Sequence, residues 1–504
     1  MTPDVVRVQY TGENTFIGNG TDVCLPRAVD NPVRWVYTPN PDCYLLKSDS
    51  LIVRVDLSTA SITYLDKEGG LLLQEDQNIP RISEKRVTKQ VIYDEHSKHI
   101  EKTADGDKEI KNVLRYDTIG HTWKYRINFK WQPLEALYGW GAHMEDYMNL
   151  RGKELYLCQH NLKAMVPVLN STAGYGLLFD AGCAMMFKDN SEGSFVELEA
   201  AKQIDYYFMK GKTMDAVVAN YRLLTGNSPM MPLYLFGYIQ SKERYVSSDD
   251  LINTLKEYRQ RQIPIDMIVQ DWNYWPEGQW GNMSMNPKFY PDKRKLADEI
   301  HSLHAKLMIS IWPNAMNCPQ HEEFKRKGWL LSGTSVYDAF NPLARKLYWN
   351  YANNEFFGNG FDAWWCDASE PLDADWTFMK DGYGADNHRQ RWELNTNLLN
   401  SVLGAERSQL YSLYHAKGIY ENQRSTNEDK RVVNLTRSSY AGQQRYSTIT
   451  WNGDTYATWQ SFAQMIPAGL NFMATGCPYW TVDIGAFFTK NGPQWFWKGD
   501  YDKG

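Results

Sequence analysis

Acidic side chains recur directly after short apolar stretches in the second half of the chain. In the stretch GNGFDAWWCDASEP, residues 358–371, two consecutive tryptophans and a cysteine are followed by Asp367. Comparable apolar stretches end in aspartate, tryptophan or arginine at Asp271, Trp272, Trp312, Arg437, Asp454 and Asp483. One such aspartate alone is more often the N-cap of the helix that follows. Four aspartates with an arginine and several tryptophans are hard to explain by capping, and we expect them to form one site.

Two carboxylates that face a pocket with aromatic walls can cleave a glycosidic bond. One acts as nucleophile and the other as general acid and base, and about 5–5.5 Å separates them in retaining enzymes. A divalent cation would favour clustered oxygen ligands rather than acids separated by tryptophans. The chain has no histidine pair at metal-ligand spacing and no Gly-x-Ser-x-Gly motif. The residues therefore favour carboxylate chemistry on a sugar, and we expect no metal and no organic cofactor.

The second half of the chain alternates short apolar stretches with amphipathic helix patterns. LFGYIQS precedes SSDDLINTLKEYRQRQ, IDMIVQDW precedes DKRKLADEIHSLHAK, and LMISIW follows. This alternation indicates parallel strands joined by helices. Seven strand candidates with no glycine-rich fingerprint after the first favour a (β/α)₈ barrel of the TIM type over a doubly wound sheet. Active groups in such a barrel lie at the C-terminal ends of the strands, which is where the acids occur.

The first part of the chain is rich in strand patterns instead. SLIVRVDLSTASITYLD alternates apolar and polar residues, and TWKYRINFKW and YGLLFDAGCAMMF are further strand candidates between turn residues. TMDAVVANYRLLTG is typical of a helix, and NSPMMP follows as a linker. We expect an N-terminal β-sandwich over residues 1–230 and the barrel over residues 231–504. A polar, partly helical insertion is expected at about residues 373–430.

Composition excludes several classes of function. The 504 residues carry a formal net charge of −6 without a basic stripe, which argues against a nucleic-acid partner. The seven cysteines are scattered without a Cys-x-x-Cys pair, so neither a disulfide framework nor a zinc site is expected. No apolar run is long enough for a membrane span, and the N-terminus has no export signal pattern. The expected partner is an oligosaccharide. Association of identical chains and a periplasmic or cytoplasmic location in a bacterium stay open.

Three sequence blocks resemble those of a known family. FDAWWCDASEP, LTRSSYAGQQRYSTITWNGD and VDIGAF resemble the blocks of glycoside hydrolase family 31, the retaining α-glycosidases. The resemblance extends to YGWGAHMEDYMNLRGKELYLCQHN and to LFGYIQSKERY in front of IPIDMIVQDWNYW. It covers most of the chain, and the subgroup that it is most similar to is that of bacterial α-xylosidases acting on side chains of the xyloglucan type.

The resemblance implies roles for individual residues. Asp367 matches the nucleophile and Asp454 the general acid and base. Glu370 matches a supporting residue, whereas we interpret Asp362 as structural. The expected sugar-binding residues are Asp271, Trp272, Trp312, Trp365, Arg437, Trp451 and Asp483. The resemblance implies that Asp367 attacks the anomeric carbon in its ionised form and that Asp454 is protonated at the start of the reaction.

The sequence departs from the family pattern near its end. Family members continue into an eighth barrel strand with an Arg-x-His block, whereas this sequence ends in GPQWFWKGDYDKG without that block. We therefore expect a barrel that lacks its last strand. The main expectation is release of terminal α-xylose by double displacement, with α-glucosidase or α-galactosidase activity as the alternative. Two further alternatives are an inactive carbohydrate-binding fragment and a transglycosylase.

Overall fold

Two antiparallel sheets packed face to face form the N-terminal half of the protein. The computed structural model describes residues 2–18, 20–26, 34–103, 106–374 and 388–488. The first sheet has five strands in the order β1 (Val5–Tyr10), β17 (Ile204–Lys210), β14 (Tyr175–Phe179), β13 (Ala164–Ser171) and β11 (Leu137–Ala142). The second has nine strands along its path: β12 (Glu154–Leu157), β15 (Met185–Asn190), β16 (Gly193–Ala201), β10 (Val113–Lys130), β6 (Leu71–Glu75), β5 (Ile62–Asp66), β4 (Leu51–Asp56), β3 (Cys43–Lys47) and β2 (Val36–Pro39). β7 (Arg81–Tyr93) pairs with β10 as an additional strand.

Aromatic side chains join the two sheets. The rings of Tyr64 on β5 and Phe208 on β17 stack with centroids 3.9 Å apart. The Tyr64 and Tyr206 hydroxyls are hydrogen-bonded at 2.8 Å, so these buried polar groups satisfy each other. The β-rich prediction for this part of the chain is thereby met by a sandwich with a continuous aromatic core.

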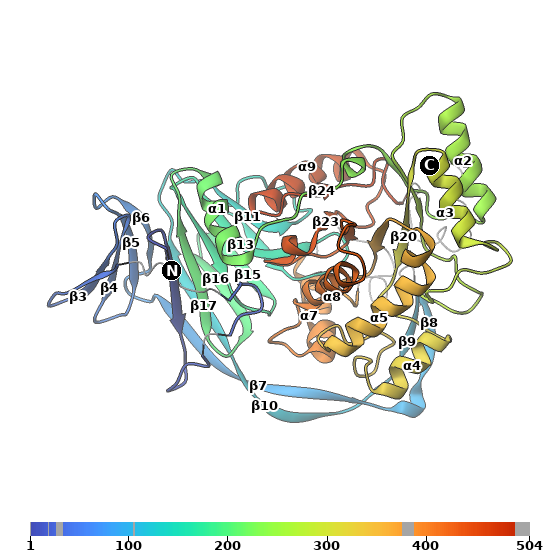
Figure 1. The fold of residues 1–504 in the computed structure, drawn as a ribbon. Coiled ribbons are helices and arrows are strands. Elements are labelled where there is room, and N and C mark those ends of the chain that lie inside the picture. Colours follow the sequence, from blue (N-terminus) through green and yellow to red (C-terminus); the bar gives the residue numbers. More distant parts are fainter. Residues whose placement is uncertain (1, 19, 27–33, 104–105, 375–387, 489–504) are drawn as a thin grey trace.

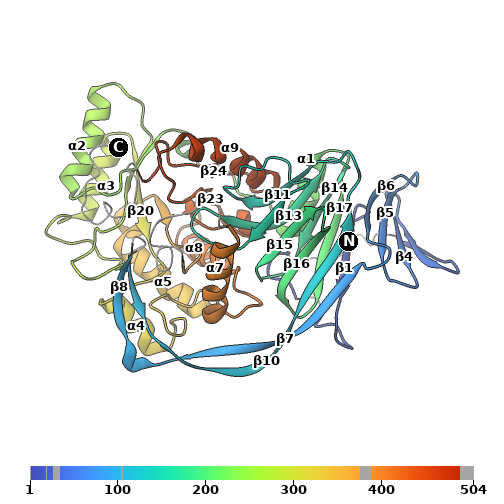
Figure 2. The ribbon, with the colours of Figure 1, turned by 180° about the vertical axis from the view of Figure 1, so that it is seen from behind.

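A long two-stranded ribbon extends from the sandwich toward the other half of the molecule. β7 and β10 run together below the helices, and β8 (His99–Thr103) and β9 (Gly106–Ile110) pair beyond them (Figures 1 and 2). Tyr93, at the end of β7, lies with its hydroxyl 3.4 Å from Ser401 Oγ, and its ring contacts Gly333. The ribbon therefore reaches the helical half at a point distant in sequence.

Parallel strands and helices alternate in the C-terminal half. The sheet runs in chain order through β18 (Ile239–Gln240), β19 (Met267–Gln270), β20 (Lys306–Ile311), β21 (Ala363–Cys366), β22 (Asn434–Thr436), β23 (Thr448–Trp451) and β24 (Trp480–Thr481). Helices between these strands are α2 (Ser248–Gln260), α3 (Lys293–Ser302), α4 (Pro319–Lys327), α5 (Pro342–Glu355), α7 (His388–Leu403), α8 (Tyr411–Thr426) and α9 (Trp459–Ala474). α1 (Met214–Thr225) links the two halves. Among the described residues, no helix is both long enough and apolar enough to cross a bilayer.

Strand alternation divides the parallel sheet into two cores. One cluster gathers inward-facing residues such as Met267, Met308 and Trp365, and the other gathers outward-facing residues such as Leu307 and Trp364 with the helices. Because successive side chains on a strand point to opposite faces, adjacent tryptophans on β21 belong to different cores. The buried stretches of four residues in β19, β21 and β23 fit a sheet that is covered on both faces.

Several predicted elements differ in extent from the observed ones. The sequence 50–66, with its continuous alternation, forms two strands, β4 and β5, because Asp56 closes a turn by accepting from the backbone of Ser58 and Thr59. The stretch YGLLFDAGCAMMF is likewise two strands, β14 and β15. LFGYIQS forms a 3-10 turn over Leu233–Phe236 and only a two-residue strand, β18.

Candidate active site

A cavity of about 650 Å³ lies at the C-terminal ends of the parallel strands. Every residue predicted as catalytic or sugar-binding lines it: Asp271, Trp272, Trp312, Trp365, Asp367, Arg437, Trp451, Asp454 and Asp483. Their positions span more than 200 residues of sequence, and the parallel strands bring them together. Glu370 does not line the cavity and is completely buried behind it.

Asp367 directly follows β21 and is fixed by its own backbone surroundings. Its backbone N–H donates to Ile311 O at 3.2 Å, which continues the pairing with β20. Its Oδ1 accepts from the Ala368 backbone N–H at 2.7 Å. Ala368 has a φ of 48°, a left-handed conformation that is uncommon for residues other than glycine. The sharp turn at the strand end thus leaves the carboxyl at the cavity while the chain continues into the buried segment with Glu370.

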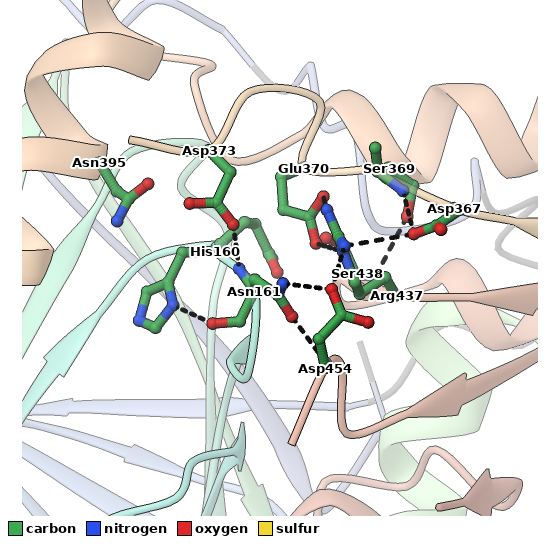
Figure 3. Close-up of polar contacts among 12 residues, drawn as sticks. His160, Asn161, Asp367, Ser369, Glu370, Asp373, Asn395, Arg437, Ser438 and Asp454 are labelled. Atoms are coloured by element: carbon green, nitrogen blue, oxygen red, sulfur yellow. Dashed lines mark hydrogen bonds and ion pairs between the residues drawn. The ribbon is translucent and has the colours of Figure 1, made fainter. Parts of the chain in front are cut away.

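One guanidinium joins three carboxylates at the base of the cavity. Arg437, one residue after β22, donates from Nε and Nη2 to the two oxygens of Glu370 at 2.9 and 3.1 Å. Its Nη1 lies 3.3 Å from Asp367 Oδ1 and donates to Asp454 Oδ2 at 3.1 Å (Figure 3). The Arg437 side chain is 1% exposed, so its charge is shielded little by water. Glu370 therefore orients the arginine, and the arginine orients the two cavity carboxylates.

Arg437 brings one oxygen of each cavity carboxyl close together. Asp367 Oδ1 and Asp454 Oδ2 approach the same nitrogen, so these two oxygens lie no farther apart than the two contact distances placed end to end. The two carboxyls are therefore close enough to act on one glycosidic bond.

Tryptophans form two walls of the cavity. The rings of Trp272 and Trp280 have centroids 5.3 Å apart, and Trp280 meets Trp312 edge-on at 5.1 Å. Trp365 and Trp451, also in the lining, form a separate edge-on pair at 4.9 Å. Flat apolar faces of this kind suit the C–H faces of a sugar ring. Trp280 was not predicted, because it lies in the loop after β19 rather than at a strand end.

Two further acids in the lining hold protons more tightly than usual. Burial raises the pKa of Asp271 well above its usual range, and the negative charge of Asp367 adds to the effect. Burial raises the pKa of Asp483 to about 7, with a further contribution from Asp454. Removing these side chains from water disfavours their ionised forms. In their protonated forms both side chains can donate a hydrogen bond to a ligand hydroxyl.

Asp362 lies at the other end of the same strand as Asp367. Its Oδ2 accepts from the Leu307 backbone N–H at 3.1 Å and contacts His301 Nε2 at 2.7 Å. These contacts join β20, β21 and α3 at the N-terminal end of the sheet, away from the cavity. Asp362 thus has the surroundings of a structural residue.

Sequence reasoning missed the residues that approach the cavity from outside the parallel sheet. Asn161, in a turn of the sandwich, donates from Nδ2 to Asp454 Oδ2 at 2.6 Å. Its backbone N–H donates to Asp373 Oδ2 at 3.1 Å, and Figure 3 shows Asn161 between Asp373 and Asp454. Asn161 is the last residue of the quoted block YGWGAHMEDYMNLRGKELYLCQHN, but strand-end reasoning applies to the barrel alone and gave it no role.

Comparison with known proteins agrees with this geometry. Residues 228–498 match the family model described as "Glycosyl hydrolases family 31 TIM-barrel domain". The chain is 32% identical to an α-xylosidase of Saccharolobus solfataricus over 97% of its own length and 62% of that protein's length. It is 31% identical to an uncharacterized family 31 glucosidase of Pseudescherichia vulneris, over 73% of the chain and 69% of that protein. The chain thus spans about three fifths of the length of the first of these relatives.

Solved structures show the same fold. The α-xylosidase of Xanthomonas citri superposes with a TM-score of 0.80 at 22% identity, over 97% of this chain and 67% of that one. An α-xylosidase from a soil metagenome, solved with xylose, gives a TM-score of 0.77 at 24% identity, over 97% of this chain and 69% of that one. The extent of the family match, the relatives at more than 30% identity and the shared fold lead to one conclusion. This chain belongs to glycoside hydrolase family 31 and contains its TIM-barrel domain.

Proposed function

We propose that the chain forms the active site of a retaining, exo-acting α-glycosidase, with Asp367 as nucleophile and Asp454 as general acid and base. The observation that supports this most directly is the shared contact of both carboxyls with Arg437 Nη1. It brings two acids from different strands close to one guanidinium at the cavity, as expected for two carboxyls that act on the same glycosidic bond. The tryptophan walls and the two further acids, Asp271 and Asp483, provide surroundings that suit a sugar.

The reaction would proceed in two displacements. An oxygen of Asp367 attacks the anomeric carbon, the bond to the leaving oxygen breaks, and Asp454 gives its proton to that oxygen. In the second step Asp454 takes a proton from water, the water oxygen attacks the same carbon, and the bond to Asp367 breaks. Two inversions give net retention. The Arg437 charge stabilises the Asp367 carboxylate before attack and after release.

We propose terminal α-xylose as the sugar that is removed, for example from xyloglucan fragments. The support comes from the α-xylosidases among the similar proteins. α-Glucose and α-galactose remain the alternatives, since they differ from xylose by the C6 hydroxymethyl group. A difference of that size in a pocket gives only about 1–3 kcal/mol of discrimination. The other residues of the cavity lining would then hold the hydroxyls of the sugar.

We also propose that the barrel, in the part of the chain that the structure describes, lacks its last strand between β24 and β18, and that the sandwich and the barrel divide near residue 230. Among the described residues, β18 pairs with β19 alone and β24 with β23 alone. The cavity lining includes Ile239 on one side of this gap and Trp480 on the other. A strand placed there would complete the cavity wall.

Hydrolysis of aryl α-glycosides tests the activity and the sugar together. We expect release of 4-nitrophenol from the α-xyloside at a higher kcat/KM than from the α-glucoside or the α-galactoside. A preference for the glucoside would remove the xylosidase assignment while leaving the family chemistry intact. Product analysis at high acceptor concentration separates hydrolysis from transglycosylation.

Replacement of the two acids tests their roles. Asp367→Ala should abolish turnover, and Asp362→Asn serves as a matched control because Asp362 lies at the opposite end of the same strand. In Asp454→Ala, activity on glycosides with good leaving groups should be partly restored by azide, which needs no base to attack. A wild-type chain that binds oligosaccharide but hydrolyses none would support the alternative of an inactive binding fragment.

A further inference from the structure

A tight turn of the sandwich reaches into the barrel beside Asp454. It joins β12 to β13, and the Lys163 backbone N–H donates to His160 O at 2.9 Å across it. The residue at its tip, Asn161, is 0% exposed, whereas turn tips usually face solvent. The next residue, Leu162, has a φ of 74°, a left-handed conformation that is costly for a branched side chain. A buried and strained turn tip suggests that its position matters for the site it contacts.

The Asn161 side chain contacts Asp454 through both of its polar atoms. Its Nδ2 donates to Asp454 Oδ2 at 2.6 Å, and its Oδ1 accepts from the Asp454 backbone N–H at 2.9 Å (Figure 3). The residue before Asp454 is Gly453, with a φ of 76°. A Cβ at that position would lie 2.4 Å from Asn161 Oδ1 and 2.7 Å from the Leu162 backbone nitrogen. The close approach of the two loops therefore requires glycine.

The backbone of Asn161 is held in turn by residues of the barrel. Its N–H donates to Asp373 Oδ2 at 3.1 Å, and its carbonyl oxygen accepts from Arg391 Nη2 at 3.1 Å. The segment that bears Asp373 is fixed where the Ala374 backbone N–H donates to Asn395 Oδ1 at 2.8 Å. The asparagine is thus anchored by its main chain, which keeps its side-chain amide within reach of Asp454.

Two donors meet on one oxygen of Asp454. Asn161 Nδ2 and Arg437 Nη1 both point at Oδ2, and they approach from different parts of the molecule. An oxygen whose lone pairs accept two N–H groups is a poor place for a proton. Figure 3 shows the other oxygen, Oδ1, turned away from Asn161. The proton that leaves with the aglycone oxygen would then be carried by Oδ1.

We propose that Asn161 is a positioning residue for the general acid and base, so that the β-sandwich contributes directly to the geometry of proton transfer. This proposal rests on the assignment of Asp454 as the acid and base. Asn161 fixes the plane of the carboxyl and keeps Oδ2 unprotonated, which presents Oδ1 to the leaving group. It acts through Asp454 and touches no reacting atom itself.

The test compares substrates that need different amounts of proton donation. An aryl α-glycoside with a poor leaving group depends on the acid, whereas the corresponding glycosyl fluoride leaves with little assistance. In Asn161→Ala we expect kcat/KM for the aryl glycoside to fall about 100-fold, as for a misplaced catalytic group, with little change for the fluoride. The high-pH limb of the kcat/KM profile should move to higher pH, because a donor to the ionised carboxylate is lost.

Two further variants separate positioning from folding. Asn161→Asp keeps an acceptor for the Asp454 N–H but replaces the Nδ2 donor, and it should reproduce the shifted pH limb if Asn161→Ala fails to fold. Asn170→Ala is the matched control: Asn170 also lies on the sandwich and donates from Nδ2 to Ala474 O of the barrel half, but it does not touch the carboxyls. Asn170→Ala should leave the ratio between the two substrates unchanged.

The outcomes distinguish this proposal from the proposed function. Equal slowing of both substrates with an unmoved pH limb in the Asn161 variants would reduce Asn161 to a structural residue and overturn the inference. A wild-type chain that hydrolyses neither substrate would overturn the proposed function, and the role of Asn161 with it. If the wild type is active but Asp454→Ala slows substrates with good and poor leaving groups equally, the role of Asp454 as acid and base would be rejected.

Discussion

At the scale of single residues, Arg437 determines the geometry of the site because it contacts three carboxylates at once. The Glu370 carboxylate, whose side chain is 0% exposed, accepts from Nε and Nη2 of Arg437. This ion pair fixes the guanidinium so that Nη1 points toward Asp367 and Asp454. Breaking a buried ion pair by removing one partner leaves a charge without compensation and costs about 3–5 kcal/mol. The same residues therefore serve stability and orientation.

A double-mutant cycle on this pair is the first prediction. Arg437→Met and Glu370→Gln should each lower the free energy of unfolding. The loss should be about 3 kcal/mol larger for Arg437→Met than for Glu370→Gln, because three acids lose their partner. The double variant should be destabilised by less than the sum of the single effects. Urea unfolding of the four proteins measures this coupling, and additive effects would show that the pair does not act as a unit.

The second prediction concerns the pH dependence of stability at Asp483. Its pKa in the folded protein is raised to about 7 by burial and by Asp454, so the folded state holds this proton more tightly than the unfolded state. The contribution of this proton to the free energy of unfolding is fully present below the pKa of about 3.9 that aspartate has in the unfolded chain, and it is lost as the pH rises toward 7. Asp483→Asn cannot ionise and should flatten this decline. Unfolding midpoints of the wild type and of Asp483→Asn at pH 4, 5.5 and 7.5 test this prediction. The stability of the variant relative to the wild type should increase with pH, and a difference in midpoint that stays constant would contradict the prediction.

Strand-end reasoning predicted acids and tryptophans that line the cavity, but it missed Trp280 and the residues that reach the site from outside the parallel sheet. Asp367 and Asp454 follow apolar stretches, and parallel strands bring such positions to one edge. Asn161 and Asp373 carry no comparable signal, because their contacts depend on how the sandwich turn meets the loop after β23. The tilt of Trp280 toward Trp312 is likewise a consequence of tertiary packing.

At the scale of elements, β21 shows how far a four-residue strand can be read from sequence. Strand geometry predicts that Trp364 and Trp365 point to opposite faces of the sheet, but it does not predict how long each strand is. β18 and β24 have only two residues each, although the apolar stretches that predicted them are longer. Apolar runs therefore predicted where strands lie and not where they end.

The paired tryptophans of β21 provide the third prediction. Trp364 is 0% exposed, packs toward the helices and donates from Nε1 to Gln423 at 2.7 Å, so Trp364→Ala should destabilise the fold by about 3–5 kcal/mol. Trp365 lines the cavity, so Trp365→Ala should mainly raise KM and lower kcat/KM. Each variant is the control for the other. Equal effects of the two on stability and on KM would contradict the assignment of opposite faces.

At the scale of the whole molecule, an apolar cluster spans the boundary between the sandwich and the barrel. A single apolar cluster joins residues of the sandwich, such as Trp140 and Phe179, with Tyr440 and Phe472 of the barrel half. Asn471 on α9 is 0% exposed and accepts from the Gly139 backbone N–H at 2.8 Å while its Nδ2 donates to Tyr147 O at 2.9 Å. The two halves are thus expected to unfold together.

Hydrogen exchange in increasing urea tests this fourth prediction. Amides of β13 in the sandwich and β20 in the barrel should lose protection at the same urea concentration. Asn471→Ala leaves the Gly139 N–H and the Tyr147 carbonyl unsatisfied, which should cost about 2–4 kcal/mol. Both strands should shift to lower urea by the same amount. A shift of β20 alone would mean that the halves unfold separately. The contact of Asn161 with Asp454 would then join two independently stable parts, and the acid and base could lose its support while the barrel stays folded.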